Sequence, residues 1–175
     1  MSDQLGEFIE PIVLAEKGRT LAGRLPVSRL DRLCQSLRDG KGDVEVSLHF
    51  DKDEGGQPNV TGRLVTTLQL ECQRCMQAMD LAMNVDVQLG IVRTQQQADS
   101  LPDNYDPLLV SEEQITAADI VEDELILALP LVALHEMEDC PAAEMLAAQD
   151  EQDVAVPQRE NPFAVLAELK KERND

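Results

Sequence analysis

The sequence predicts an α+β fold, an antiparallel sheet of three to five strands with N-terminal, central and C-terminal helices packed around it. Three stretches alternate apolar and polar residues with a period of two, the pattern of a half-buried strand. Turn-forming residues separate these stretches, so neighbouring strands are expected to run antiparallel. Three further stretches carry apolar residues at helical spacing. The strand stretches are 44–50, 60–70 and 79–91, and the helical ones are 27–39, 116–129 and 161–173.

The N-terminal part of the chain combines an apolar stretch with a basic helix. Residues 8–14 are mostly apolar and are interpreted as a strand. Pro26 precedes the predicted helix 27–39, and Gly40 ends it. The outer face of this helix carries three arginines that are candidate partner-binding residues. They are Arg29, Arg32 and Arg38.

The three central strands are expected to follow one another through short connections. Residues 51–59 are rich in Asp, Gly, Pro and Asn and predict a hairpin turn. The second strand runs into Cys72-x-x-Cys75, and the third begins just beyond this pair. The two cysteines are therefore predicted to lie in a turn between strands.

After the third strand, residues 95–107 are interpreted as a polar loop and 108–110 as a short strand. Thr116 followed by Asp119 resembles a capping box and predicts a helix start, and Pro130 ends this helix. An acidic cluster on the helix is a second candidate for partner binding. It consists of Glu122, Asp123 and Glu124.

The chain is expected to form one domain with a tethered helix. Residues 1–140 form the predicted α+β domain. Residues 141–160 are small, acidic and weakly patterned, which predicts a flexible linker. Within 161–175, Asn161 and Pro162 supply an N-cap and a proline at the first helical position, so this segment is predicted to be a helix.

Charge divides the chain into two regions of opposite sign. The formal net charge is −19, and residues 94–158 contain sixteen acidic residues and no Lys or Arg. Residues 17–41 hold seven basic residues against two acidic ones. This distribution favours a basic partner for the acidic region, while the basic segment could touch RNA. The alternative is that the acidity only keeps the protein soluble.

One group of residues has the spacing of a metal site. Cys72 and Cys75 resemble the knuckle of a zinc ribbon, because two thiolates from one turn can hold a single tetrahedral ion. His135 and Cys140 could complete a Cys₃His set around one structural zinc. Two alternatives stay open: ordinary reduced thiols, and a redox pair, which lacks the strand–turn–helix context of that motif.

No motif of a known catalytic class is visible in the sequence. It has no glycine-rich phosphate loop, no His-Glu-x-x-His and no G-x-S-x-G elbow. The chain is therefore expected not to be an enzyme and to take no small-molecule substrate. Its N-terminus lacks the features of a signal peptide and no run of eighteen apolar residues occurs, so a cytoplasmic protein without a membrane partner is expected.

Several separated motifs together resemble one bacterial family. LECQRC ends a strand and is followed in order by LPDNYDPLLV, IVEDELILALPLVALH and NPFAVLAELKK. In this order they resemble the YceD family of large ribosomal RNA subunit accumulation proteins, over about residues 10–171. Some relatives have further cysteines after the position of Cys140, where this chain has PAAEM.

The resemblance implies a role in the synthesis, processing or stability of 23S ribosomal RNA. Together with the charge pattern it predicts a non-catalytic accessory factor that binds a ribosomal protein or a large-subunit assembly factor. The alternatives are direct binding of precursor RNA through the basic segment 17–41, or an RNA-processing enzyme.

Overall fold

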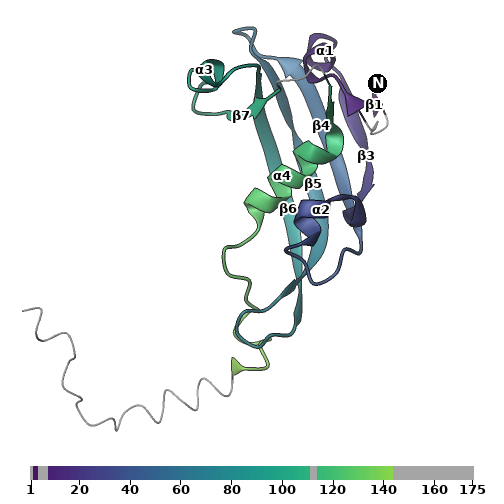
Figure 1. Ribbon diagram of the computed structural model, residues 1–175, viewed down its shortest axis with the longest axis vertical. Coiled ribbons are helices and arrows are strands. Elements are labelled where there is room, and N and C mark those ends of the chain that lie inside the picture. Colours follow the sequence, from purple (N-terminus) through teal and green to yellow (C-terminus); the bar gives the residue numbers. More distant parts are fainter. Residues whose placement is uncertain (1, 4–7, 111–113, 144–175) are drawn as a thin grey trace, which may run out of the picture. The chain divides into compact units, whose positions relative to one another are not determined.

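The computed structural model describes residues 2–3, 8–110 and 114–143. The chain divides into two units, Met1–His135 and Glu136–Asp175. The predicted helix in 161–175 and all but the first residues of the predicted linker lie outside the described residues. The first unit holds every helix and strand named below (Figure 1).

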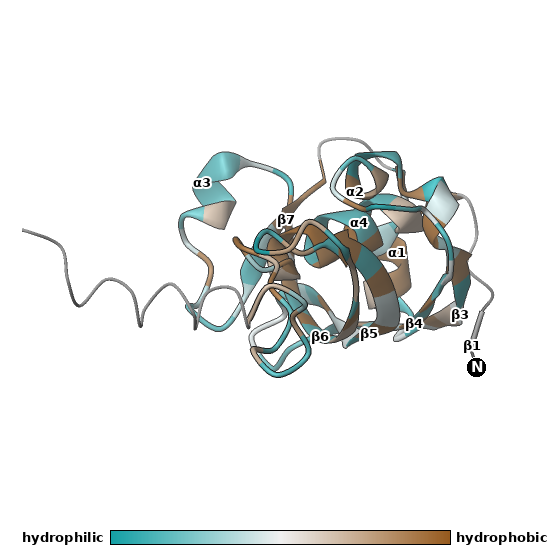
Figure 2. Ribbon diagram, turned by 90° about the horizontal axis from the view of Figure 1, so that it is seen from below, coloured by the Kyte–Doolittle hydropathy of each residue, from teal (hydrophilic) through white to brown (hydrophobic). Residues whose placement is uncertain are grey.

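A mixed sheet forms the centre of the first unit. Its strand order is β1-β3-β4-β5-β6-β7, and a two-stranded pair, β2 with β8, lies apart from it. The helices α1, α2 and α4 lie on the side towards which the sheet curves (Figures 1 and 2). The strands are β1 (Ser2–Asp3), β2 (Phe8–Ile9), β3 (Thr20–Pro26), β4 (Asp43–Lys52), β5 (Pro58–Glu71), β6 (Ala78–Val92), β7 (Asp106–Leu109) and β8 (Ile115–Thr116). The helices are α1 (Pro11–Glu16), the 3-10 turn η1 (Val27–Arg29), α2 (Asp31–Cys34), α3 (Gln95–Ala98) and α4 (Ala117–Ala128).

The α+β prediction is confirmed, but the sheet is mixed rather than purely antiparallel. Strands β3, β4, β5 and β6 are antiparallel neighbours, as expected for the body of the sheet. The short strands β1 and β7 pair in parallel at its two edges. A parallel neighbour requires a long connection, and residues 93–105 provide one between β6 and β7. Alternation within a strand does not reveal such a connection.

The N-terminal apolar stretch is mostly helical, so the strand predicted for 8–14 is wrong beyond its first two residues. Pro11 occupies the first turn of α1, where its missing N–H costs nothing and its fixed φ suits a helix. Ala15 is buried, and Ile12 and Leu14 pack against the core. The stretch therefore covers the sheet instead of extending it.

The basic helix predicted over 27–39 is broken into η1 and α2. Leu30 separates them with φ −106° and ψ 78°, outside the helical region. Its side chain and that of Leu33 are nevertheless buried, as the apolar spacing predicted. The N–H of Arg38 then donates to the Gln69 carbonyl at 2.8 Å, which ties the chain to the sheet after one helical turn.

The β5–β6 hairpin is the longest pairing of the sheet and positions the cysteine turn. Its register runs from Asn59 opposite Gly90 to Glu71 opposite Ala78. The hairpin continues past α2 and α4 (Figure 1). The cysteine turn begins directly after the last pair, so the strands hold it at the far end of the sheet.

The predicted start of α4 is confirmed. The Asp119 N–H donates to the Thr116 hydroxyl at 3.0 Å, and the Thr116 N–H donates to the Asp119 carboxylate at 3.3 Å. This reciprocal pair is a capping box. Within the described part of the chain, no helix is long and apolar enough to cross a membrane.

Candidate metal site and partner-binding surfaces

Cys72 and Cys75 lie in the turn between β5 and β6, as predicted. The Cys72 N–H donates to the Gln77 carbonyl at 2.9 Å, and the Met76 N–H donates to the Cys72 carbonyl at 2.8 Å. Met76 adopts a positive φ of 59°, which tightens the turn. Cys72 is 0% exposed, whereas Cys75 is half-buried. The turn thus directs one sulfur inward and keeps the other near the surface.

His135 lies beside this turn, although it follows Cys72 by 63 residues. The segment after α4 runs along the turn, where the Gln73 N–H donates to the Ala133 carbonyl at 2.8 Å. The His135 Nδ1 lies 3.4 Å from the Cys75 Sγ. The His135 backbone N–H lies 3.5 Å from the Cys72 Sγ.

A carbonyl contact determines which nitrogen of His135 can bind a metal. Nε2 lies 3.1 Å from the Ala78 carbonyl oxygen, which can only accept a hydrogen bond. Nε2 therefore carries the proton, and in the neutral ring Nδ1 keeps its lone pair. This is the arrangement of metal-bound histidines, where the second nitrogen donates to a carbonyl or carboxylate.

The spacing of these atoms is close to that of the ligands of a tetrahedral ion. The ligand atoms of Cys72, Cys75 and His135 lie within 4.8 Å of one another. A tetrahedral zinc with ordinary bond lengths places its S and N ligands roughly 3.5–3.8 Å apart. These three residues could hold a metal ion. Cys140, the fourth predicted ligand, belongs to the other unit and follows His135 by five residues along the chain.

The environment of Cys72 favours its thiolate. Burial alone would raise the pKa of this thiol. Hydrogen bonds from the backbone N–H groups of His135, Cys75 and Arg74, together with the Cys75 thiol, outweigh burial and lower the pKa of Cys72 to about 5. At neutral pH the sulfur is therefore largely anionic, which is the form that binds a metal.

Arg32 and the acidic cluster of α4 bind one another. The buried Glu122 accepts from the backbone N–H groups of Arg32 and Leu33, at 2.7 and 3.1 Å. It also accepts from the Arg32 Nε at 2.8 Å. The Arg32 Nη1 pairs with Asp123 at 2.8 Å. The hydrogen bond to Glu122, and to a lesser extent that to Asp123, raises the pKa of Arg32 above the ordinary arginine value. These three candidate partner-binding residues thus join α2 to α4.

The other candidate arginines have different surroundings. Arg38 donates from Nη1 to the Glu71 carboxylate at 3.3 Å and to the Met76 carbonyl at 3.2 Å, beside the cysteine turn. Arg29 is exposed in η1. The three arginines therefore do not form one basic face. Arg38 lies beside the cysteine turn, Arg32 in the contact between α2 and α4, and Arg29 in solvent.

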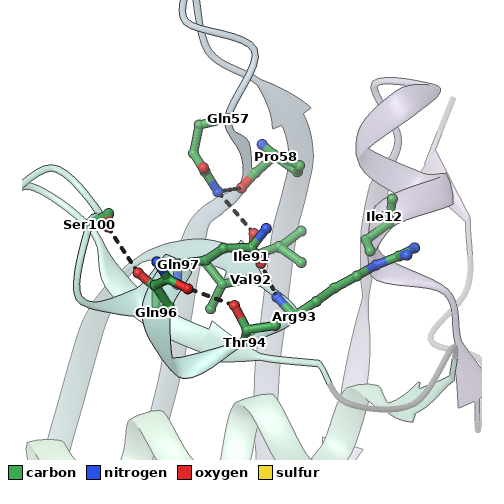
Figure 3. A pocket seen from close by; sticks show the side chains of 10 residues that line it. All are labelled: Ile12, Gln57, Pro58, Ile91, Val92, Arg93, Thr94, Gln96, Gln97 and Ser100. Carbon is green, nitrogen blue, oxygen red and sulfur yellow. Dashed lines mark hydrogen bonds between the residues drawn. The ribbon is translucent and has the colours of Figure 1, made fainter.

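A polar cavity of about 610 Å³ lies at the other end of the hairpin (Figure 3). Gln57 donates from Nε2 to the Ile91 carbonyl at 2.9 Å, and the Arg93 N–H donates to the Gln97 side chain at 2.8 Å. Arg93 is the charged residue among the described residues that line it. Gln96, Gln97 and Ser100 come from residues 95–107, which were predicted to form a polar loop, and the run of three glutamines was the available signal.

Comparisons with known proteins place the chain in one family. The family model described as large ribosomal RNA subunit accumulation protein YceD matches residues 60–170. The large ribosomal RNA subunit accumulation protein YceD of Haemophilus influenzae is 34% identical over 167 residues, covering 93% of this chain and 94% of that protein. No solved structure matches. This chain therefore belongs to the YceD family of large ribosomal RNA subunit accumulation proteins.

Proposed function

We propose that this chain is a non-catalytic accessory factor that supports the synthesis, processing or stability of 23S ribosomal RNA by binding partners. The observation that carries the proposal is family membership over most of the chain, since the relative is named a large ribosomal RNA subunit accumulation protein. Its partner is a basic ribosomal protein or a large-subunit assembly factor.

The charge distribution supports a protein partner. The acidic region 94–158 repels phosphate and attracts a basic surface. A protein that binds RNA through Lys and Arg exposes these side chains until it meets the RNA. Covering that surface would prevent premature contacts for as long as the two proteins stay bound.

A structural zinc at the end of the hairpin is the second part of the proposal. Cys72, Cys75, His135 and Cys140 would be its ligands. Cys140 follows His135 closely enough for the chain to bring its thiol to the ion, because five residues span up to roughly 17 Å. Four protein ligands leave no open coordination position, as in structural sites. The zinc would join the segment after α4 to the β5–β6 turn.

Co-purification from cells tests the partner-binding function. Tagged protein should enrich large-subunit proteins or assembly factors, and the enrichment should fall as salt is raised because the attraction is electrostatic. In cells that lack the protein, the ratio of 23S to 16S ribosomal RNA should be lower than in cells that contain it. Enrichment of none of these proteins, together with an unchanged ratio of the two RNAs, would contradict the proposal.

Direct binding of precursor RNA is a second candidate function. Lys17 and Arg29 are exposed within the basic segment 17–41, whereas Arg32 is paired with α4. If RNA binds here, replacing Lys17 and Arg29 by Glu should weaken binding and reduce its salt dependence. Unchanged affinity would argue against this candidate.

An RNA-processing enzyme is the third candidate function. In that case, incubation of metal-loaded protein with precursor 23S RNA should yield shortened or modified RNA.

A further inference from the structure

A groove between α4 and the edge strand β7 combines apolar and acidic side chains. It encloses about 370 Å³, and both elements are labelled in Figure 1. Leu108, Ile126 and Leu127 supply apolar lining. Asp106 comes from β7, and α4 adds two further carboxylates. Side chains from a strand and a helix therefore line one groove.

The apolar side of the groove is incompletely covered. Leu127 lines it and is 80% exposed. Leu108, on β7, also lines it and is half-buried. Large apolar side chains gathered on two neighbouring elements are typical of an interaction surface rather than of isolated surface leucines. A partner that covered them would remove apolar area from water.

Among the residues that the structure describes, acidic side chains outnumber basic ones in the groove. Asp106, Asp123 and Glu124 line it together with one described cation, Arg32. That guanidinium is already paired at 2.8 Å with both Glu122 and Asp123. Burial, then repulsion from Asp106 and Asp123, raises the pKa of Glu124. An added cation would relieve this repulsion.

We propose that this groove binds a basic segment of a protein partner, with a Leu, Ile or Met side chain against Leu127 and a Lys or Arg beside Asp106 and Glu124. The inference rests on the proposed function, in which a basic protein is the partner. Charge complementarity decides the occupant. A nucleic acid would bring phosphate against the carboxylates, and a purely apolar segment would leave them without a counter-charge. The volume suits one or two side chains.

A binding assay on the full chain tests the groove directly. The probe is a short synthetic peptide of lysine and leucine with a fluorescent label, and its analogue has glutamine in place of leucine. The groove variant is Asp106→Asn with Glu124→Gln. The matched control is Glu54→Gln with Asp103→Asn, which removes the same charge from exposed positions outside the groove.

The groove variant should bind the leucine-containing peptide about tenfold more weakly, because close charge pairs in a partly dry site contribute strongly. The control should change affinity by less than about twofold, since exposed charges are screened. Leu127→Gln should reduce the preference for leucine over glutamine in the peptide. Circular dichroism and thermal unfolding establish that each variant is folded.

Three results would overturn the inference. One is an equal loss of affinity in the control, which would make the attraction non-specific. Another is equal affinity for the two peptides. The third is a different occupant of the groove. This would be a second copy of the chain, if the wild type forms a dimer and only the groove variant is a monomer, or an RNA, if a short RNA binds the wild type and the control but not the groove variant.

Co-purification separates this inference from the proposed function. If the wild-type chain enriches large-subunit proteins and the groove variant enriches them equally, the groove inference fails and the function stands. If the wild-type chain enriches none, the proposed function fails. The peptide assay then still decides whether the groove recognises basic apolar segments.

Discussion

At the scale of single residues, Glu122 combines an acidic sequence environment with a buried position in the fold. It stands among acidic residues, yet it is only 6% exposed. It accepts hydrogen bonds from two backbone N–H groups of α2 and from the Arg32 side chain. These donors lie about ninety residues away from Glu122 in the sequence. An ionised carboxylate is tolerated here because its oxygens are hydrogen-bonded.

Replacing Glu122 by Ala should lower the free energy of unfolding by about 1–3 kcal/mol, because buried N–H groups lose their acceptor. Urea denaturation measures the change. Asp123→Asn is the control, since the carboxylate of Asp123 is half exposed and such pairs contribute about 0–1 kcal/mol. Equal losses in both variants would show that Glu122 contributes no more than a surface pair.

Gly62 is a second position that packing restricts. It lies opposite Leu48 on β4, and a Cβ built there would collide with the Ser47 carbonyl oxygen. Gly62→Ala should therefore destabilise the fold by about 1–3 kcal/mol through displaced backbone. Gly55→Ala is the control, because its Cβ would meet no backbone atom within 4 Å and only the Asp53 Oδ1 at 3.3 Å. Chemical denaturation showing no difference between the two variants would contradict this reading.

At the scale of elements, local patterns predicted the strands better than the helices. Alternation over 44–50 and 79–91 depends on neighbours within one strand, so β4 and β6 were predictable. The break at Leu30 and the parallel pairing of β7 depend on contacts with distant segments. The cysteine turn was predictable from its spacing, whereas the tautomer of His135 required the Ala78 carbonyl.

The turn between β5 and β6 should bind zinc. Protein purified without a histidine tag should contain close to one zinc per chain by elemental analysis. Cys75→Ser should remove most of it, because a hydroxyl is a much poorer zinc ligand than a thiolate. Cys34→Ser is the matched control, since its thiol donates to the Val27 carbonyl away from the turn. Zinc near zero in the wild type would leave these thiols without a metal.

Glu124, on α4, should make the free energy of unfolding depend on pH. The raised pKa of Glu124 means that its charge opposes folding, at a cost that is present above its folded-state pKa. The cost disappears below the ordinary glutamate pKa of about 4.3. Glu124→Gln should therefore unfold at higher urea concentration than the wild type at pH 7, with no advantage at acid pH. Asp103→Asn, an exposed substitution, should show no such crossover.

At the scale of the whole molecule, charges of opposite sign are separated along the chain. The region 94–158 is uniformly acidic, while the positive charge of 17–41 is partly used within the fold. Arg32 pairs with α4 and Arg38 with β5. The net field therefore favours a basic partner, and a factor that works by occupying such a partner must be present in comparable amount.

This requirement gives a test in cells that contain graded amounts of the protein. Each molecule that acts by binding can protect only one partner at a time, whereas an enzyme turns over many substrates. The ratio of 23S to 16S ribosomal RNA should therefore rise in proportion to the protein until the partner is saturated. Quantitative blotting of the protein and both RNAs measures the relation. Full recovery at a few per cent of the normal amount would instead favour catalysis, and loss of that recovery in Cys75→Ser would then direct attention to the metal site.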